Sequence, residues 1–277
     1  MTAHGQPSPL DRNDHDHHHH DHEHEHEHTD GHGHQDREHP DNPDRRSTVP
    51  ADGARTVTLE ARILAKNDAL AAQNRAWLAE RGIVALNVMS SPGSGKTTLL
   101  QRTIAEHTGG RVVSVIEGDQ ETVLDAERIR ATGAPVVQIN TGAGCHLDAD
   151  MLRRGLEALQ PATGSLVFVE NVGNLVCPAL FDLGESAKVV VISVTEGDDK
   201  PLKYPHMFAA ADLVVINKTD LLPYVDFDVE TCSRHARALN PGVAILALSA
   251  TTGEGMTSWA QWLGDQVTGA CRPDRDR

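Results

Sequence analysis

After Gly82 the chain repeats one pattern seven times: a short apolar run rich in valine and isoleucine, followed in most cases by an amphipathic stretch with helical spacing. Apolar strands that alternate with helices indicate a mainly parallel sheet covered on both faces, so we predict a three-layer α/β domain. The predicted strands span 83–89, 111–116, 135–139, 165–169, 188–194, 212–216 and 243–248. The predicted helices span 96–107, 121–132, 148–159, 201–210, 226–239 and 256–268, preceded by one over 56–81.

Residues 1–48 have a composition that does not suit a packed core. They carry twelve acidic and four basic residues, and Met1 and Leu10 are their only large aliphatic or aromatic side chains. Such a segment buries too little apolar surface to offset the entropy lost on ordering, so we expect a disordered tail. We assign residues 49–277 to a single domain.

The tail contains the run DHDHHHHDHEHEHEH, residues 14–28. An expression tag usually has about six consecutive histidines, whereas these are interleaved with acids, so a solvated leader or a metal-binding tail fits better. Near neutral pH most imidazoles are unprotonated and can bind metal ions, whose charge the acids offset. The candidate ligands are His15, His17, His18, His19, His20, His22, His24, His26 and His28.

The charge and hydropathy of the chain exclude several classes of partner. The net charge is −15, which argues against nucleic-acid binding. No apolar run approaches the roughly 20 residues of a membrane span, and the N-terminus lacks an apolar signal core. We therefore expect a cytoplasmic protein whose four cysteines are reduced and available to metal.

The first strand is predicted to end in SSPGSGKTT, residues 90–98, which resembles a phosphate-binding loop. Its lysine can reach the β- and γ-phosphates of a nucleotide, and its first threonine can bind Mg²⁺. The helix N-terminus that follows favours negative charge. Ser90 stands where this motif usually begins with glycine. The residues expected to hold the phosphates are Gly93, Ser94, Gly95, Lys96, Thr97 and Thr98.

Two acids follow other predicted strands at the same edge of the sheet. Asp119 ends IEGD, and Glu170 begins ENVG, which also contains Gly173. A carboxylate there can hold Mg²⁺ through water, together with Thr97, and a glycine N–H can sense a γ-phosphate. Either acid could instead cap a helix.

The strand at 212–216 runs into NKTD, residues 217–220, which resembles the guanine-recognition motif of GTPases. Asp220 would accept hydrogen bonds from the guanine N1–H and 2-amino groups, which adenine lacks, so GTP is favoured over ATP. Asn217 would support the loop and Lys218 would cover the base. Ser249 and Ala250, after the last strand, would close over guanine.

TGAGCHLDAD, residues 141–150, places Cys145 beside His146, and Cys177 lies in NVGNLVCP. Thiolate and imidazole suit Zn²⁺ or Ni²⁺, and three ligands would leave an open, exchangeable site. The same residues could equally be two buried cysteines and a surface histidine. We expect no function for Cys232 or Cys271.

SSPGSGKTT, IEGD, GAGCH, ENVGNLVCP, DDKPLKYP and NKTD together resemble the HypB family, GTPases that help to insert nickel into nickel–iron hydrogenase. The motifs fall within residues 56–270. The resemblance implies slow GTP hydrolysis with Mg²⁺ and a nucleotide- and metal-dependent homodimer. It also implies that Cys145, His146 and Cys177 bind nickel or zinc at or near the subunit interface. The implied partners are a second nickel-maturation factor and the hydrogenase large subunit.

The resemblance also gives the tail a role. Some members carry an N-terminal cysteine cluster, whereas no cysteine precedes Cys145 here, so the histidine-rich tail would serve as a nickel reservoir. One alternative is a urease-type nickel-insertion GTPase, although its metal motif is usually Cys-Pro-His. Another is a nickel storage protein that uses the fold only to dimerise, against which Lys96 and Asp220 argue.

DDKPLKYP, residues 198–205, is open to two interpretations. Lys200 and Lys203 could reach phosphate, guanine or a partner subunit, or they could form a solvated turn.

Overall fold

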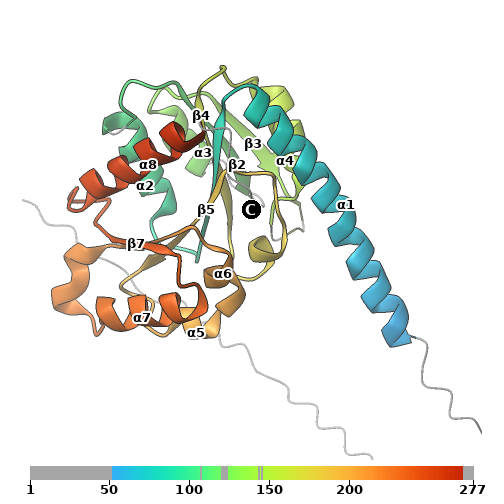
Figure 1. The fold of residues 1–277 in the computed structure, drawn as a ribbon. Coiled ribbons are helices and arrows are strands. Elements are labelled where there is room, and N and C mark those ends of the chain that lie inside the picture. The colour runs from blue at the N-terminus through green and yellow to red at the C-terminus, as the bar shows by residue number, and fades with distance from the viewer. Residues whose placement is uncertain (1–51, 107, 120–123, 143, 145, 271–277) are drawn as a thin grey trace, which may run out of the picture. The chain divides into compact units, whose positions relative to one another are not determined.

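The structure, a computed structural model, describes residues 52–106, 108–119, 124–142, 144 and 146–270. Within these residues seven parallel strands form one sheet in the order β3-β2-β4-β1-β5-β6-β7 (Figure 1). The strands are β1 (Val84–Ser90), β2 (Val113–Asp119), β3 (Val136–Asn140), β4 (Leu166–Gly173), β5 (Ala187–Ser193), β6 (Leu213–Asn217) and β7 (Ala244–Ala247). The predicted α/β class with a mainly parallel sheet is confirmed, and the sheet is parallel throughout.

Helices cover both faces of this sheet (Figure 1). On one face α2, α3 and α8 pack on the strands through side chains such as Leu99, Ile129 and Trp259. On the other face α1 and α4 cover β1, β2 and β4, while α6 and α7 cover β5 and β6. The α-helices are α1 (Asp52–Glu80), α2 (Lys96–Glu106), α3 (Leu124–Arg130), α4 (Ala149–Leu159), α5 (Lys200–Lys203), α6 (Pro205–Ala210), α7 (Val229–Leu239) and α8 (Met256–Ala270).

Two buried asparagines attach α1 to the rest of the domain. Asn67 accepts from the Ala149 N–H at 2.9 Å and donates to the Asp182 carbonyl at 2.7 Å. Asn74 donates to the carbonyls of Ala149 and Leu183 at 2.8 and 2.9 Å. Because a buried amide is costly without partners, these contacts fix α1 against the start of α4.

The prediction of one continuous helix over 201–210 is wrong. The stretch 201–210 is divided into α5 and α6 at Tyr204, whose φ of −127° and ψ of 55° are not helical. Pro205 is the cause, because its ring disfavours helical backbone in the residue before it. Two 3₁₀ helices, η1 (Cys177–Leu180) and η2 (Thr219–Tyr224), were also not expected.

The tail (residues 1–48) and Cys271 lie outside the described residues. None of the described helices combines the length and the apolar composition that a membrane crossing needs.

Candidate functional site

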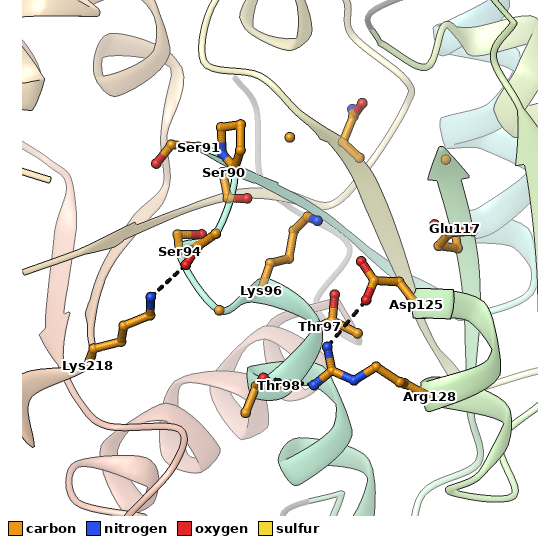
Figure 2. Close-up of a pocket in the computed structure, with 16 residues that line it drawn as sticks. Ser90, Ser91, Ser94, Lys96, Thr97, Thr98, Glu117, Asp125, Arg128 and Lys218 are labelled. Atoms are coloured by element: carbon orange, nitrogen blue, oxygen red, sulfur yellow. Dashed lines mark hydrogen bonds and ion pairs between the residues drawn. The ribbon is translucent and has the colours of Figure 1, made fainter. Parts of the chain in front are cut away.

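A cavity of about 460 Å³ opens beside the loop between β1 and α2. Its size lies within the roughly 300–1,000 Å³ of small-ligand pockets. Figure 2 shows Lys96, Thr97 and Thr98 on the turn that begins α2, with Asp125 and Arg128 facing them from α3. Ligands of parallel α/β sheets bind at the carboxyl ends of the strands, which is where this cavity lies.

The backbone of the loop has the conformation that its glycines permit. Gly93 and Gly95 have φ angles of +73° and +92°. A Cβ at Gly95 would lie 2.6 Å from Asn217 Nδ2, so this position also has no room for a side chain. Among the described non-glycine residues only Gln160 and Lys218 have positive φ, so the backbone of Ser90 does not require the glycine usual in this motif.

Lys96 and Thr97 both contact one carboxylate oxygen of Glu170. The Lys96 ammonium lies 2.9 Å from Oε1, and the Thr97 hydroxyl donates to the same atom at 2.7 Å. Glu170 is 1% exposed, and its Oε2 has no hydrogen-bond partner among the described residues. A buried carboxylate oxygen of this kind can accept a hydrogen bond from water or from an additional ligand.

Asp119 and Gly173 are the other two residues predicted near the γ-phosphate, and the structure describes the surroundings of Gly173 alone. Asp119 ends β2 at the same edge of the sheet, but its side chain lies outside the described set. Gly173 ends β4 and lines the cavity, where a Cβ would lie 3.4 Å from Pro92 Cα.

Asn217 joins three loops that are far apart in sequence. Its Nδ2 donates to the Ser94 carbonyl at 2.9 Å, and its Oδ1 accepts from the N–H groups of Lys218 and Ala250 at 2.7 and 3.0 Å. The Lys218 ammonium donates to the Gly93 carbonyl at 2.6 Å, one of the contacts drawn in Figure 2. The phosphate loop and the NKTD loop therefore form one hydrogen-bonded unit.

Asp220 is positioned by the loop after β7. The Ser249 hydroxyl donates to its Oδ1 at 2.5 Å and itself accepts from the Thr252 N–H at 3.0 Å. Ser249 is fully buried, so the carboxylate is held by a rigid neighbour. The structure thus joins the predicted base-recognition residues Asn217, Lys218, Asp220, Ser249 and Ala250 through hydrogen bonds at the ends of β6 and β7, and Lys218 among them lines the cavity.

Arg128 is a cavity residue that the sequence interpretation missed. Its guanidinium donates to the Thr98 hydroxyl at 3.0 Å and to Gln101 Oε1 at 2.7 Å, and it lies 3.3 Å from Asp125 Oδ1. The available signal was position: α3 follows the loop after Asp119, so its first turns must lie at the same edge of the sheet.

The two lysines of DDKPLKYP have different surroundings. Lys200 lies 3.3 Å from Glu196 Oε2, an atom that also accepts from the Ser91 hydroxyl, and it lines a second cavity of about 310 Å³ beside Gly173. Lys203 pairs with Asp199 at 2.7 Å on the exposed side of α5. Lys200 alone is therefore near the phosphate loop, whereas Lys203 fits a solvated turn.

The predicted metal ligands come from two loops, one of which is incompletely described. Cys145 lies outside the described residues. The His146 ring stacks on Phe181 with centroids 4.0 Å apart, and burial lowers the pKa of His146 despite the opposing charge of Asp148. Cys177 begins η1 and is partly exposed. The described residues contain no cluster of three metal-binding side chains, so the site of three ligands stays a prediction.

Cys232 has the surroundings of a core residue. It is fully buried in α7, and burial raises the pKa of its thiol to about 12. The expectation that it has no chemical role agrees with this placement.

Comparison with known proteins gives consistent matches. The family described as "CobW/HypB/UreG, nucleotide-binding domain" matches residues 84–247. The hydrogenase maturation factor HypB of Escherichia coli K12 is 57% identical over 212 residues, which cover 76% of this chain and 73% of that protein. The crystal structure of HypB from Archaeoglobus fulgidus is 43% identical with a TM-score of 0.69, over 74% of this chain and all of that one. The crystal structure of HypB from Helicobacter pylori in complex with nickel is 36% identical with a TM-score of 0.70. The match covers 76% of this chain and all of that one.

We predict that Gly95→Ala weakens binding of GDP by at least about 10-fold, because the left-handed backbone and the contact with Asn217 each add strain of roughly 1–3 kcal/mol. Calorimetric titration of GDP measures this. Gly264→Ala is the matched control, since a Cβ at Gly264 in α8 meets nothing within 4 Å. Equal affinities for the two variants would contradict the prediction.

Proposed function

Because the chain belongs to the HypB family of hydrogenase maturation factors, we propose that it is a GTP-hydrolysing nickel metallochaperone that helps to insert nickel into nickel–iron hydrogenase. The observation that carries the GTPase part is the bond from Asn217 to the Ser94 carbonyl, which joins the base-recognition loop to the phosphate loop. The nickel part is supported by the related structure from Helicobacter pylori, which contains nickel.

The base is guanine in this proposal. The Asp220 carboxylate, held by Ser249, would accept from the N1–H and 2-amino groups, and the Lys218 stem would cover the ring. Adenine offers no such pair of donors and would leave the carboxylate unsatisfied, which opposes ATP.

Hydrolysis is proposed to depend on positioning and on charge. Lys96 would leave Glu170 and contact the β- and γ-phosphates, and the Thr97 hydroxyl would turn toward Mg²⁺. The positive charge of that ion would stabilise the negative charge that develops on the phosphate during hydrolysis. The vacant Oε2 of buried Glu170 fits a water bound to that ion, and Asp119 from β2 is the second candidate acid. Gly173 would bring its N–H toward the γ-phosphate.

The cargo site is proposed to consist of Cys145, His146 and Cys177. Nickel and zinc both accept thiolate and imidazole, and the nickel complex of the Helicobacter pylori relative supports nickel. An imidazole whose pKa is lowered by burial is mostly neutral at pH 7, which is the form that binds metal. Since hydrolysis would reshape ENVG, which leads to Cys177, the loss of the γ-phosphate would release the ion.

A homodimer would complete the site. Val176 and Leu180 lie on either side of Cys177 along the chain and are 55% and 54% exposed, so two large apolar side chains near the proposed metal ligand are open to a partner. A second copy of the chain would cover them when nucleotide and metal are bound. A second nickel-maturation factor and the hydrogenase large subunit are the other proposed partners, and the cytoplasmic location stays a prediction.

The GTPase proposal predicts that the full-length protein hydrolyses GTP slowly and ATP at least about 100-fold more slowly. Lys96→Ala should lower GTP hydrolysis at least about 100-fold, because the charge that stabilises the transferring phosphoryl group is lost. Phosphate release at saturating Mg²⁺ measures both. Equal rates for the wild type and Lys96→Ala would favour a storage protein instead.

The tail is proposed to be a nickel reservoir. Removing residues 1–48 should lower the number of nickel ions bound per chain and leave the GTP turnover unchanged, because the tail supplies ligands but no group of the nucleotide site. Metal analysis and phosphate release on the same preparation test this division. A fall in turnover would contradict it.

A further inference from the structure

The end of β4 carries two adjacent residues that face opposite sides of the sheet. Phe168 packs with α2 and α8, whereas Val167 and Val169 pack with α1 and α4. Successive side chains of a strand alternate between faces, so Glu170 faces the side of α2 and Asn171 faces the side of α4. The phosphate loop and the start of α4 therefore meet neighbouring residues of one strand.

The pairing of β4 with β1 is irregular at this point. Val88 pairs with Glu170, but Ser90 pairs with Gly173, so β4 contains one extra residue between these pairs. Such a bulge bends a strand and redirects side chains, and it is common beside functional sites. Here it follows directly on the carboxylate that holds Lys96 and Thr97.

Asn171 reaches the loop that contains His146. Its Oδ1 accepts from the Leu147 N–H at 3.1 Å and from the Val172 N–H at 3.0 Å. Its Nδ2 donates to Asn87 Oδ1 at 3.2 Å. Asn171 is 1% exposed, so water does not replace these partners, and both the oxygen and the nitrogen of its amide are hydrogen-bonded.

Asn87, the partner of the Asn171 Nδ2, belongs to a chain of buried hydrogen bonds. Asn87, fully buried in β1, donates to Glu185 Oε1 at 3.2 Å, and Glu185 Oε2 accepts from the Leu183 N–H at 2.7 Å. Phe181, on which His146 stacks, lies two residues before Leu183. The His146 loop is thus held on one side by Asn171 and on the other by the segment that Glu185 fixes.

The Leu147 side chain adds a second connection to the nucleotide side. Leu147 is fully buried, and a Cβ at Gly118 would lie 2.7 Å from its Cγ. Gly118 immediately precedes Asp119 in β2. Movement at the end of either β2 or β4 would therefore displace Leu147, whose neighbour is His146.

We propose that Asn171 is the positioning residue that couples the nucleotide site to the metal-binding loop. The inference rests on the proposed function and deepens it. When a nucleotide and Mg²⁺ draw Lys96 and Thr97 away from Glu170, the end of β4 rearranges, and the Asn171 amide carries that change to the Leu147 N–H and so to His146. Asn171 also lines the cavity beside the phosphate loop, and its role in this account is to position the Leu147 N–H and His146 rather than to bind phosphate or metal.

The test compares nickel affinity with GDP and with a non-hydrolysable GTP analogue, using the full-length protein. The readout is the thiolate-to-nickel charge-transfer absorption, because the histidine tail has no cysteine and cannot produce it. We expect the two wild-type dissociation constants to differ by roughly 5–150-fold, the usual range of coupling between sites. Both nucleotides are used at saturating concentration, so that a change in nucleotide affinity does not enter the ratio. In Asn171→Ala the ratio should then approach one.

Asn74→Ala is the matched control. It also removes a buried amide beside the start of α4, which donates to the carbonyls of Ala149 and Leu183. Neither of these hydrogen bonds reaches β4, so the variant should keep the wild-type ratio. A wild-type ratio in Asn171→Ala, or an equal loss of coupling in both variants, would overturn the inference and leave the proposed function standing. Absence of the absorption band would overturn the proposed metal site together with the inference. A ratio of one in the wild-type protein would overturn the proposed dependence of nickel release on the nucleotide, again together with the inference.

A second measurement needs no variant. We expect the Leu147 amide to exchange its hydrogen at different rates in the GDP and GTP-analogue states of the wild type, because its acceptor is moved. Identical protection of Leu147 in both states would overturn the role of Asn171.

Discussion

The Glu170 carboxylate is the contact on which the arrangement of this site depends. It is almost completely buried, and it draws the Lys96 ammonium and the Thr97 hydroxyl to a single oxygen. Burial of a carboxylate is costly unless it is paired, so this contact stabilises the positions of Lys96 and Thr97 at the start of α2. A ligand that offers better partners to Lys96 and Thr97 must compete with Glu170, which makes the carboxylate sensitive to the nucleotide.

Asn217 is the second side chain on which the arrangement depends. Asn217 holds the phosphate loop, the NKTD loop and the loop after β7 with one side chain, and Gly95 leaves it the room to do so. The proposed phosphate and base sites are therefore joined at the ends of β1 and β6. The proposed metal-binding loop, in contrast, is attached through β2 and β4, on the opposite face of the sheet.

The repeated apolar runs were sufficient to predict the α/β class, because buried parallel strands need continuous apolar sequence. Many of the residues that line the cavity belong to motifs at strand ends and could be predicted from those motifs. The break at Pro205 could have been predicted from the residue alone, whereas the roles of Arg128, Asn87 and Asn171 could not. Their hydrogen-bond partners lie in other strands or helices, and the spacing of residues along the chain does not predict contacts between such distant segments. The placements of the Asp119 carboxylate and of Cys145 stay predictions.

The central claim is that Glu170 links phosphate chemistry to the rest of the protein, and single-turnover hydrolysis of GTP by Glu170→Gln tests it most directly. The amide keeps the size of the side chain and one acceptor oxygen, but it replaces the other oxygen by an NH2 donor and removes the charge. The account predicts that the variant binds GTP and hydrolyses it at least about 100-fold more slowly than the wild type, as for loss of other electrostatic contacts in active sites. A rate equal to that of the wild type would contradict it.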